Sequence, residues 1–401
     1  MNIANNRIFV DVTELSIFDK GTGIQRVTKA IFNSLSTRPP LDWQVVAVRG
    51  DGTLGKFVSV QHLNTQVNHA DGEEIIEIQS EDIYLSLDLT YNISKNLNQE
   101  LQNARNNGAR IYFVVYDLIP LMYPEWFFGN NDWFEGNDYL DLFEHWFNCA
   151  VQSDGLICIS KAVQDDVSAW IAIDKPANSA IPKLGFFHLG ADIASSLTSK
   201  GLPINCKKII QVIQSRKTFL MVGTIEPRKG HQLALEAVEK LWSEGVDVNL
   251  VFVGKQGWKV DALAERIKTH AKLSNQLFWL SDISDEYLRA IYQASSVLLA
   301  LSDAEGFGLP LVEAAYYMLP IVARNIPVFK EICKGGAFYF DGSNNHDLYV
   351  DLKKWLYQYE QNTHPKSNEI QVLSWAESTS QLLTVLENMS GISFSWNANE
   401  Q

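Results

Sequence analysis

The chain has 401 residues, an apolar fraction of 46% and a formal net charge of -14 at pH 7. This length exceeds what one hydrophobic core usually organises, so we expect two domains. The negative charge argues against a general nucleic-acid-binding protein and against attraction to an anionic membrane. It does not exclude an anionic ligand, because a few local cations and helix N-termini can hold a diphosphate inside an acidic protein.

The cysteines and the terminal sequence indicate the cellular compartment. Cys149, Cys158, Cys206 and Cys333 form no CxxC pair, which predicts free thiols in a reducing compartment and no zinc site. The N-terminus lacks a basic segment followed by a long apolar core, and no apolar run is long enough to span a bilayer. The sequence therefore predicts a cytoplasmic protein without a resident metal.

Short β-branched and aromatic runs alternate with segments of helical period, which is typical of parallel sheets wrapped by helices. In the first half, strands are expected to start at Arg7, Val45, Ile83, Arg110, Gly155 and Phe186. In the second half, they are expected to start at Thr218, Asn249, Leu277, Ser296, Pro320 and Ala337. Helices are expected, for example, at 234–242, 260–273 and 373–388.

The segment 191–208 loses this apolar rhythm and is rich in small and polar residues, which predicts a linker. We therefore expect two Rossmann-like, doubly wound α/β domains of similar size that face each other across an interdomain cleft. Ligands of such sheets bind at the carboxyl ends of the strands. The predicted parts are a first domain at 1–190, the linker, a second domain at 209–372, a final helix at 373–390 that packs back on the first domain, and a tail at 391–401.

A glycine-rich segment lies between the first expected strand and a helix that starts near Ile24. Gly21 and Gly23 in this segment would let the backbone approach a ligand closely, and the N–H groups of the helix N-terminus would bind phosphate. The segment is not the GxGxxG of a dinucleotide-binding fold, because Arg26 stands where the third glycine would be. A flexible surface loop explains the segment about as well.

The sequence GTIEPRKGH, residues 223–231, follows an expected strand and opens a helix. Arg228 and Lys229 at this place predict a cationic clamp for phosphate, strengthened by the positive end of the helix. A solvated charged turn is the alternative. We interpret His231 as a solvent-facing cap residue.

The sequence AEGFGLPLVEA, residues 304–314, also follows an expected strand. Glu305 and Glu313 would be about 12 Å apart if the whole span were helical, so they would hold two separate hydroxyl-bearing parts of one ligand. Gly306 and Gly308 would let backbone N–H groups reach the ligand. A helix start with acidic residues near its positive end explains the carboxylates but not the glycines.

The order of these three motifs resembles the retaining glycosyltransferases of family 4, which have the GT-B fold. The resemblance extends from about Phe9 to Trp375, and the E-G-F-G-x-P-x-x-E block is its most specific part. The segments DLIPLMYPEWF, from Asp117, and ICISKAVQDDV, from Ile157, are similar to bacterial mannosyl- and rhamnosyltransferases that build surface polysaccharides such as O-antigen.

This resemblance implies a role for each motif. Arg228 and Lys229 would hold the diphosphate of a nucleotide-sugar donor. Glu305 would bind hydroxyls of the transferred sugar, and Glu313 would bind the ribose. The other donor-binding positions that it implies are Gly21, Gly23, Gly223, Lys255, Ile283, Gly306, Phe307, Gly308 and Leu309. Of these, Lys255 and Ile283 would lie near the nucleobase.

Asp117 ends an expected strand and joins Arg228, Lys229 and Glu305 as a candidate catalytic residue. Tyr116, directly before it, stands where many of these glycosyltransferases carry a histidine. Asp117 would contact sugar or acceptor, or it would cap the following turn as a structural residue. Candidates for the acceptor side are Arg26, Trp126, Phe127 and Trp133.

Aromatic rings suit stacking on sugars, and weak peripheral contact with the inner face of the membrane is a further hypothesis for this aromatic region. Residues 139–151 have helical spacing and are expected to be mostly core.

The resemblance implies a hexosyltransferase that retains the anomeric configuration and needs no metal or other cofactor. Its partners would be a nucleotide-sugar donor and a glycan or lipid-linked acceptor. Mannose from GDP-mannose is the first choice of donor, and rhamnose from dTDP-rhamnose is the second. The same motifs are also compatible with a sugar-nucleotide epimerase of this fold and with an inactive nucleotide-sugar-binding scaffold.

Overall fold

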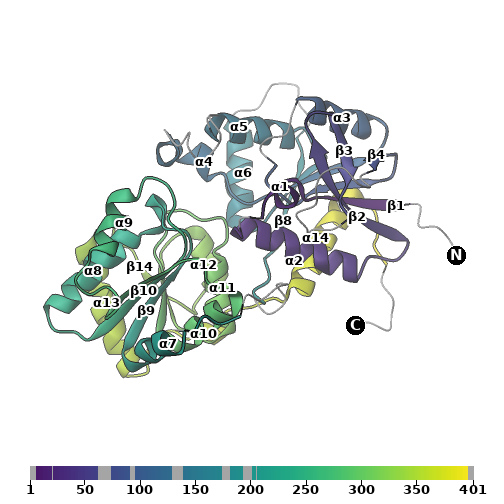
Figure 1. The fold of residues 1–401 in the computed structure, drawn as a ribbon. Helices are drawn as coiled ribbons and strands as arrows, with labels where there is room; N and C mark the ends of the chain where they lie inside the picture. Colours follow the sequence, from purple (N-terminus) through teal and green to yellow (C-terminus); the bar gives the residue numbers. More distant parts are fainter. Residues whose placement is uncertain are drawn as a thin grey trace. The chain divides into compact units, whose positions relative to one another are not determined.

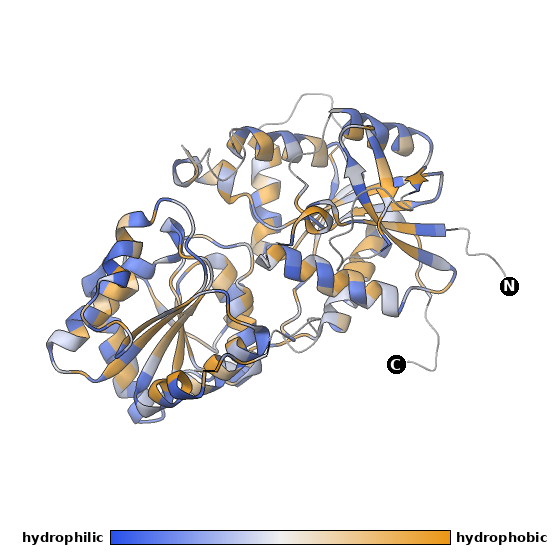
Figure 2. Cartoon of the chain, in the orientation of Figure 1, coloured by the Kyte–Doolittle hydropathy of each residue, from blue (hydrophilic) through white to orange (hydrophobic). Residues whose placement is uncertain are grey.

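A computed structural model describes residues 6–19, 21–61, 74–90, 95–128, 139–173, 181–192, 201–204 and 206–395. Contacts between Cα atoms divide the chain into two units, which are Met1–Gly190 with Leu373–Gln401, and Ala191–Val372. Each unit is built around one sheet with helices beside it (Figure 1). In both sheets the strands are predominantly apolar, while the helices carry apolar and polar residues together (Figure 2).

The first unit contains an eight-stranded sheet in the order β4-β3-β2-β1-β5-β6-β7-β8. Its strands are β1 (Asn6–Asp11), β2 (Trp43–Asp51), β3 (Lys56–Ser59), β4 (Ile75–Ile76), β5 (Ile83–Ser86), β6 (Arg110–Val115), β7 (Gly155–Cys158) and β8 (Lys183–Phe186). The pairs β2–β3 and β3–β4 are antiparallel, and the others are parallel. Since strand order reverses at β1, the carboxyl ends of β1 and β5 flank a topological switch point.

The helices of the first unit are α1 (Thr13–Ile17), α2 (Gly23–Thr37), α3 (Lys95–Asn106), α4 (Ile119–Met122), η1 (Pro124–Trp126), α5 (Tyr139–Ala150), α6 (Lys161–Ile173) and α14 (Trp375–Ser390). Although α14 comes at the end of the chain, it packs beside α2 and β8. Phe143, Trp146 and Phe147 of α5 are buried, so the expected core role of 139–151 is confirmed. Beyond α14, Phe394 packs edge-on against Trp43 with ring centroids 5.3 Å apart.

The second unit contains a six-stranded parallel sheet in the order β11-β10-β9-β12-β13-β14. Its strands are β9 (Lys217–Val222), β10 (Val248–Val253), β11 (Leu277–Leu280), β12 (Val297–Ala300), β13 (Ile321–Arg324) and β14 (Phe338–Phe340). Its helices are α7 (Cys206–Ser215), η4 (Pro227–Lys229), α8 (His231–Ser243), α9 (Asp261–Lys268), α10 (Asp285–Ala294), α11 (Leu309–Tyr316), α12 (Pro327–Cys333), α13 (Asn345–Glu360) and η5 (Ser367–Glu369). Side chains of α8, α9 and α13 pack with the sheet into one apolar core.

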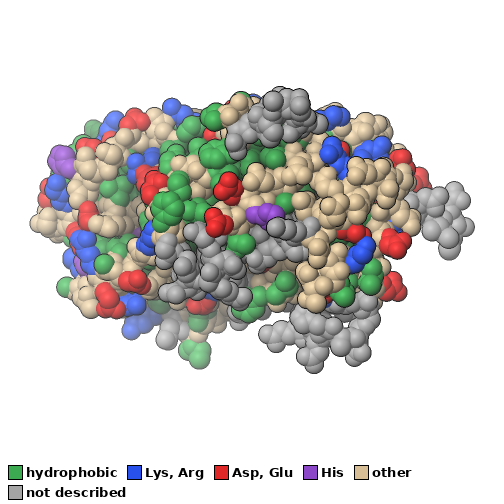
Figure 3. Space-filling view, turned by 90° about the horizontal axis from the view of Figure 1, so that it is seen from above, with side chains coloured by type: hydrophobic (Ala, Val, Ile, Leu, Met, Phe, Trp, Pro, Cys, Tyr) green, Lys and Arg blue, Asp and Glu red, His purple; other side chains and the backbone are tan. Residues whose placement is uncertain are grey.

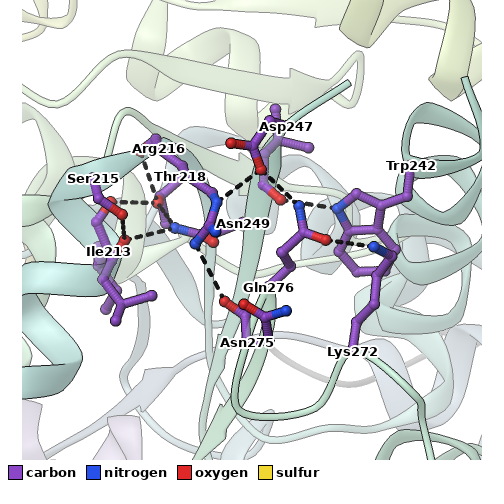
Figure 4. Close-up of polar contacts among 12 residues, drawn as sticks. Ile213, Ser215, Arg216, Thr218, Trp242, Asp247, Asn249, Lys272, Asn275 and Gln276 are labelled. Carbon is purple, nitrogen blue, oxygen red and sulfur yellow. Dashed lines mark hydrogen bonds and ion pairs between the residues drawn. The ribbon is translucent and has the colours of Figure 1, made fainter. Parts of the chain in front are cut away.

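A polar network joins the amino ends of β9, β10 and β11 (Figure 4). Asp247 accepts hydrogen bonds from Arg216 Nε at 2.7 Å and from Gln276 Nε2 at 2.8 Å. The side chain of Asn249 donates to Thr218 Oγ1 at 3.0 Å. Since ligands of parallel sheets bind at the opposite, carboxyl ends, we assign this network a structural role.

Several elements differ from the sequence-based prediction. A strand was expected to start at Phe186, but β8 starts earlier, at Lys183, and ends at Phe186. The helix expected at 260–273 ends at Lys268, where Thr269 caps it. Short α1 occupies part of the segment expected to be a loop, and β3 and β4 were not predicted because runs this short show no clear alternation.

The lengths of the apolar helices and the distribution of surface charge can be compared with the sequence-based expectations. In the described part of the chain, no helix is both long enough and apolar enough to cross a bilayer. On the face shown in Figure 3, acidic and basic side chains are interspersed, so the net negative charge is not gathered into one patch there.

Candidate functional site

Two of the predicted motifs meet at the carboxyl end of the second sheet. Residues 223–231 follow β9, and residues 301–308 follow β12. Because β9 and β12 are hydrogen-bonded neighbours, the two segments lie side by side although they are far apart in sequence. The backbone N–H of Asp303 donates to the carbonyl of Arg228 at 2.8 Å, which joins them directly.

Glu305 lies between the two predicted cations. Arg228 Nη1 is 3.2 Å from Glu305 Oε2, and Lys229 Nζ forms an ion pair with Glu305 Oε1. Ser302 Oγ donates to the same Oε1 atom at 2.7 Å. Arg228 is held further by Glu226 Oε1 at 2.9 Å and by the carbonyl of Ala304 at 2.7 Å. The structure therefore brings Arg228, Lys229 and Glu305 into one cluster.

The electrostatics of this cluster keep Glu305 ionised. Burial disfavours its charged form, but Lys229 and Arg228, together with hydrogen bonds, outweigh burial and lower the pKa of Glu305 to about 2. The side chain of Glu305 is only 12% exposed, so its interaction with both cations is weakly screened by solvent. The cluster thus presents two cations and an ionised acceptor in one place.

Glycine allows the two segments to approach this closely. Gly230 has φ of 76°, and a Cβ atom there would lie 2.8 Å from Leu301 Cβ and 2.9 Å from the Leu301 carbonyl oxygen. Gly308, which precedes α11, has φ of 92°, and a Cβ would lie 2.9 Å from side-chain atoms of Leu311 and Phe329. Both positions need the left-handed conformation that glycine adopts without strain.

Glu313 is placed differently from Glu305. It lies in the middle of α11, is 2% exposed and accepts a hydrogen bond from Tyr292 OH of α10 at 2.7 Å. Glu305 precedes the start of α11 at Leu309, so the helical spacing assumed for the two glutamates does not apply. Gly306 and Phe307 lie in the same loop as Glu305, and Phe307 is buried.

The predicted nucleobase residues follow neighbouring strands of the same sheet. Lys255 comes after β10 and forms a 3.1 Å ion pair with Asp282, which comes after β11 and directly precedes Ile283. The side chains of Lys255 and Asp282 are mostly exposed. Gly223, at the end of β9 with φ of 140°, lies beside the aliphatic part of Lys229.

In the first unit, Thr22 caps α2 through a capping box with Gln25, so the helix begins at Gly23, next to the expected start. Gly21 and Gly23 are exposed at this N-terminus, and Arg26 in the first turn is partly buried. Gly23 is therefore the first residue of α2, whereas Gly21 precedes the helix.

Asp117 has the contact expected of a turn-capping residue. Its Oδ1 atom accepts a hydrogen bond from the backbone N–H of Ile119 at 3.0 Å, at the start of α4. Tyr116 is buried, and its hydroxyl donates to the carbonyl of Leu87 at 2.7 Å. This geometry favours the structural interpretation of Asp117.

The acceptor-side candidates differ in position. Trp126 stacks on Tyr123 with ring centroids 4.5 Å apart. Phe127 is only 7% exposed and packs against Tyr139, so its ring is core and does not fit the predicted acceptor-side role. Trp133 lies outside the described residues.

The prediction for His231 was wrong, because the residue is buried and does not face solvent. It is 2% exposed, and neither ring nitrogen has a hydrogen-bond partner among the described residues. Burial, together with the nearby Lys229, lowers the pKa of His231 to about 3, so the ring is neutral. His231 lines a pocket of about 30 Å³ together with Lys229, Ser302 and Glu305.

A buried carboxylate pair in the first unit was also missed. Asp11 ends β1 and accepts hydrogen bonds from Thr13, Tyr84 and Thr90. Asp88 follows β5 and accepts from the backbone N–H of Leu15 in α1 at 2.6 Å. Burial raises the pKa of both carboxyl groups, and raises that of Asp88 to about 7. This pair anchors α1 at the switch point, and its sequence signal was an aspartate at the end of each of two expected strands.

Comparison with known sequences identifies relatives. Residues 206–372 match the family model described as Glycosyl transferases group 1. The chain is 40% identical over 387 residues to a serotype-specific mannosyltransferase WbdA of Escherichia coli, across 94% of this chain and 44% of that protein. It thus spans less than half the length of this relative. It is also 26% identical over 136 residues to the O-antigen chain mannosyltransferase RfbU of Salmonella typhimurium, across 34% of this chain and 37% of that one.

Solved structures show the same fold. The sucrose-phosphate synthase of Thermosynechococcus elongatus aligns with a TM-score of 0.64 at 13% identity, across 97% of this chain and 100% of that one. Anabaena Alr3699/HepE in complex with UDP aligns with a TM-score of 0.59 at 15% identity, across 96% and 100%. These likenesses, with two units built on mainly parallel sheets, confirm the predicted α/β fold class, which is GT-B.

Proposed function

We propose that this protein transfers mannose from a nucleoside diphosphate to a glycan or lipid-linked acceptor. The match of residues 206–372 to the family model for glycosyl transferases group 1 supports this reaction class. The proposed setting is the synthesis of a bacterial surface polysaccharide. The 40% identity to a serotype-specific mannosyltransferase supports the choice of sugar and process. GDP-mannose is the proposed donor.

The observation that carries this proposal is the cluster of Arg228, Lys229 and Glu305 at the carboxyl ends of β9 and β12. Departure of a nucleoside diphosphate develops negative charge on a phosphate oxygen. Two fixed cations beside that oxygen would stabilise this charge, which is commonly the largest contribution to catalysis in such sites. Their combined charge also supports a reaction that needs no divalent metal.

Glu305 is the proposed partner of the transferred sugar. An ionised carboxylate only accepts hydrogen bonds, and sugar hydroxyls can donate them. Glu313 is the proposed ribose-binding residue, and its carboxylate is positioned by Tyr292. Since Glu305 and Glu313 come from the loop and the helix of one continuous segment, donor sugar and ribose would be held by a single element.

We propose that the reaction retains the anomeric configuration through front-face attack. The bond between the anomeric carbon and the phosphate oxygen breaks, and the acceptor oxygen bonds to the same face of that carbon. The proton of the acceptor hydroxyl passes to the departing phosphate oxygen. Arg228 and Lys229 would hold this phosphate near the acceptor while the proton moves.

The first experiment is a thermal-shift panel of nucleotide sugars, followed by transfer assays with the donors that bind. A true donor raises the melting temperature because it binds the native state preferentially. GDP-mannose should give the largest shift and a product of retained configuration by NMR, with activity unchanged by EDTA. A larger shift with dTDP-rhamnose would reassign the donor.

Two outcomes point to other functions. Accumulation of an epimer or a free sugar without any transfer would support an epimerase. Binding without turnover would support a scaffold.

Substitution of the cations tests the site itself. Arg228→Ala or Lys229→Ala should lower the donor turnover number by at least about 10²-fold, as is typical for loss of one transition-state contact. Lys268→Ala is the matched control, because Lys268 is 52% exposed and its ion pair with Glu265 contributes little. Wild-type turnover in both cluster variants would remove the cluster from the mechanism.

A further inference from the structure

His231 is a buried polar residue without the contacts that buried polar residues normally have. Its ring is held edge-on against Phe252, with centroids 5.1 Å apart, at the first position of α8. Neither nitrogen is paired within the described residues. The large majority of buried side-chain donors and acceptors are paired, and an unpaired one lowers stability. A ring with two such atoms therefore needs an explanation beyond packing.

The ring lines the same pocket as the proposed donor-binding residues. The polar residues of this pocket are Lys229, His231, Ser302 and Glu305, and the rest of the lining is mainly apolar. Lys229 and Ser302 both contact Glu305 Oε1, so these three satisfy one another. Within the pocket, His231 is the polar side chain whose hydrogen-bonding atoms are unpaired in the described structure.

The chemistry of the ring narrows the class of ligand. A neutral imidazole offers one donor and one acceptor, and a hydroxyl group can both accept and donate. A phosphate oxygen only accepts, and Arg228 and Lys229 are better partners for it. The pocket volume of about 30 Å³ exceeds the roughly 10–15 Å³ that one water molecule needs, so a hydroxyl group has room beside the ring.

We propose that His231 is a specificity-determining residue that hydrogen-bonds one hydroxyl group of the donor's sugar in the pocket it shares with Lys229, Ser302 and Glu305. This inference rests on the proposed function and adds a residue that selects among donor sugars. A site that hydrogen-bonds a substrate hydroxyl discriminates strongly against analogues that lack it, because the buried polar group is then left unpaired.

The test combines replacement of the His231 ring with removal of each hydroxyl group of the donor's sugar in turn. The values of kcat/KM are measured for wild type and His231→Phe with GDP-mannose and its 2-, 3-, 4- and 6-deoxy analogues. Wild type should lose at least about tenfold with the analogue that lacks the recognised hydroxyl, and His231→Phe should use that analogue and GDP-mannose equally within about twofold. His364→Phe is the control, because His364 is also buried with an unpaired Nδ1 but packs on Trp355 and Tyr359.

A stability measurement separates this role from a structural one. His231→Phe removes unpaired buried atoms, so its melting temperature should equal or exceed that of wild type. A lower melting temperature together with equal losses for all donors would mean that the ring holds a structural water, and would overturn the inference. If the larger phenyl ring prevents folding, His231→Leu provides the same comparison.

The proposed function and the role of His231 fail in different ways. If wild-type protein transfers mannose but His231→Phe changes kcat/KM by the same factor for GDP-mannose and for every deoxy analogue, only the proposed role of His231 is refuted. If wild-type protein neither binds nor uses GDP-mannose or another nucleotide sugar, the proposed function fails, and this inference fails with it.

Discussion

Glu305 forms ion pairs with the two cations that are proposed to hold the donor. Its carboxylate pairs with both Arg228 and Lys229, and its low pKa of about 2 means that this competition persists across the physiological pH range. A diphosphate bound by the same two cations must therefore compete with an internal anion. If the proposed donor binds there, its free energy of binding would include the cost of loosening these ion pairs.

Glu305→Gln should separate binding from transfer. Without the carboxylate charge, affinity for free GDP should rise by roughly tenfold, because the phosphate no longer competes with an internal anion for Arg228 and Lys229. Turnover should fall by at least about 10²-fold, since the proposed contact to the sugar is weakened. Calorimetry with GDP and a transfer assay measure the two effects. Glu265→Gln, at an exposed site, is the control, and weaker GDP binding with normal turnover would contradict the assignment.

The cluster of charged residues was predictable because residue type and strand end were enough to place it. Arg228, Lys229 and Glu305 each follow an expected strand, and the carboxyl ends of parallel strands lie at the same edge of a sheet. The pairing of β9 with β12 then brings the two segments together. The orientation of His231 could not be predicted. It depends on the left-handed turn at Gly230, which starts α8 with the ring directed inward.

At the scale of elements, the turn η4 and the segment after β12 bring the charged cluster together through a backbone hydrogen bond. The turn η4 rests on the segment after β12, and at Gly230 the two segments leave no room for a Cβ atom. Most of the strands were predictable, because they are short, mainly apolar runs. The hairpin-like additions β3 and β4 were not, because strands of four and two residues carry no periodic signal.

Gly230→Ala should displace η4 and with it both cations. A Cβ atom at this position would clash with the backbone of Leu301, in addition to the strain of φ near 76°. Gly245 provides a matched control, because its φ is 81° and an added Cβ there would meet nothing within 4 Å. We expect Gly245→Ala to cost about 1 kcal/mol and leave turnover unchanged. Gly230→Ala should cost more and lower turnover as well, and equal effects in denaturant melts and transfer assays would refute this interpretation.

The anchoring of α1 should depend on pH. Burial raises the pKa of Asp88 from its ordinary value of 3.8 to about 7, with Asp11 adding to the effect, so the folded state favours the protonated form. This contribution to stability is complete below pH 3.8 and is lost as the pH rises to about 7.

Asp88→Asn removes this titration while keeping an oxygen that accepts from Leu15 N–H. Between pH 5 and pH 7, the melting temperature of wild type should fall relative to that of the variant by at least about 2 °C, and the difference should then level off. Scanning calorimetry in buffers of equal ionic strength measures it. Parallel curves across this range would show that Asp88 ionises normally in the fold.

The molecule consists of two units, one formed by a single segment of the chain and the other by two segments. Residues 191–372 form the second unit from one continuous segment, whereas the first unit includes α14 from the end of the chain. The residues proposed to bind the donor phosphates, sugar and ribose all lie in that continuous segment. The glycine-rich helix start and Asp117 lie in the first unit.

The helix α14 is joined to the first unit by specific contacts. Leu382, Leu383, Leu386 and Met389 are buried. Ser378 Oγ donates to the carbonyl of His188 at 2.7 Å, and the N–H of His188 donates to Gln381 at 3.0 Å. Any side chain at Gly185 would collide with Val385 and Met389, so the fit between helix and sheet is close.

A stop codon after Val372 should therefore unfold one unit and spare the other. The first unit loses five buried apolar side chains of α14, which are Trp375, Leu382, Leu383, Leu386 and Met389. Each large-to-small loss in a core costs about 2–5 kcal/mol, so the summed loss exceeds a domain's margin of stability. Limited proteolysis with mass spectrometry should leave a protected fragment near 191–372, and GDP should still raise its melting temperature. Transfer should be abolished, because the first unit is no longer folded.

A stop after Ser395 is the matched control, because it keeps α14 and the packing of Phe394 on Trp43. It should leave both proteolysis and transfer unchanged. If the longer truncation also destroyed GDP binding, the second unit would depend on the first for its fold, and the donor site could not be the property of residues 191–372 alone. If it left transfer intact, α14 would be dispensable, and the buried contacts that join it to β8 and α2 would carry little of the stability of the first unit.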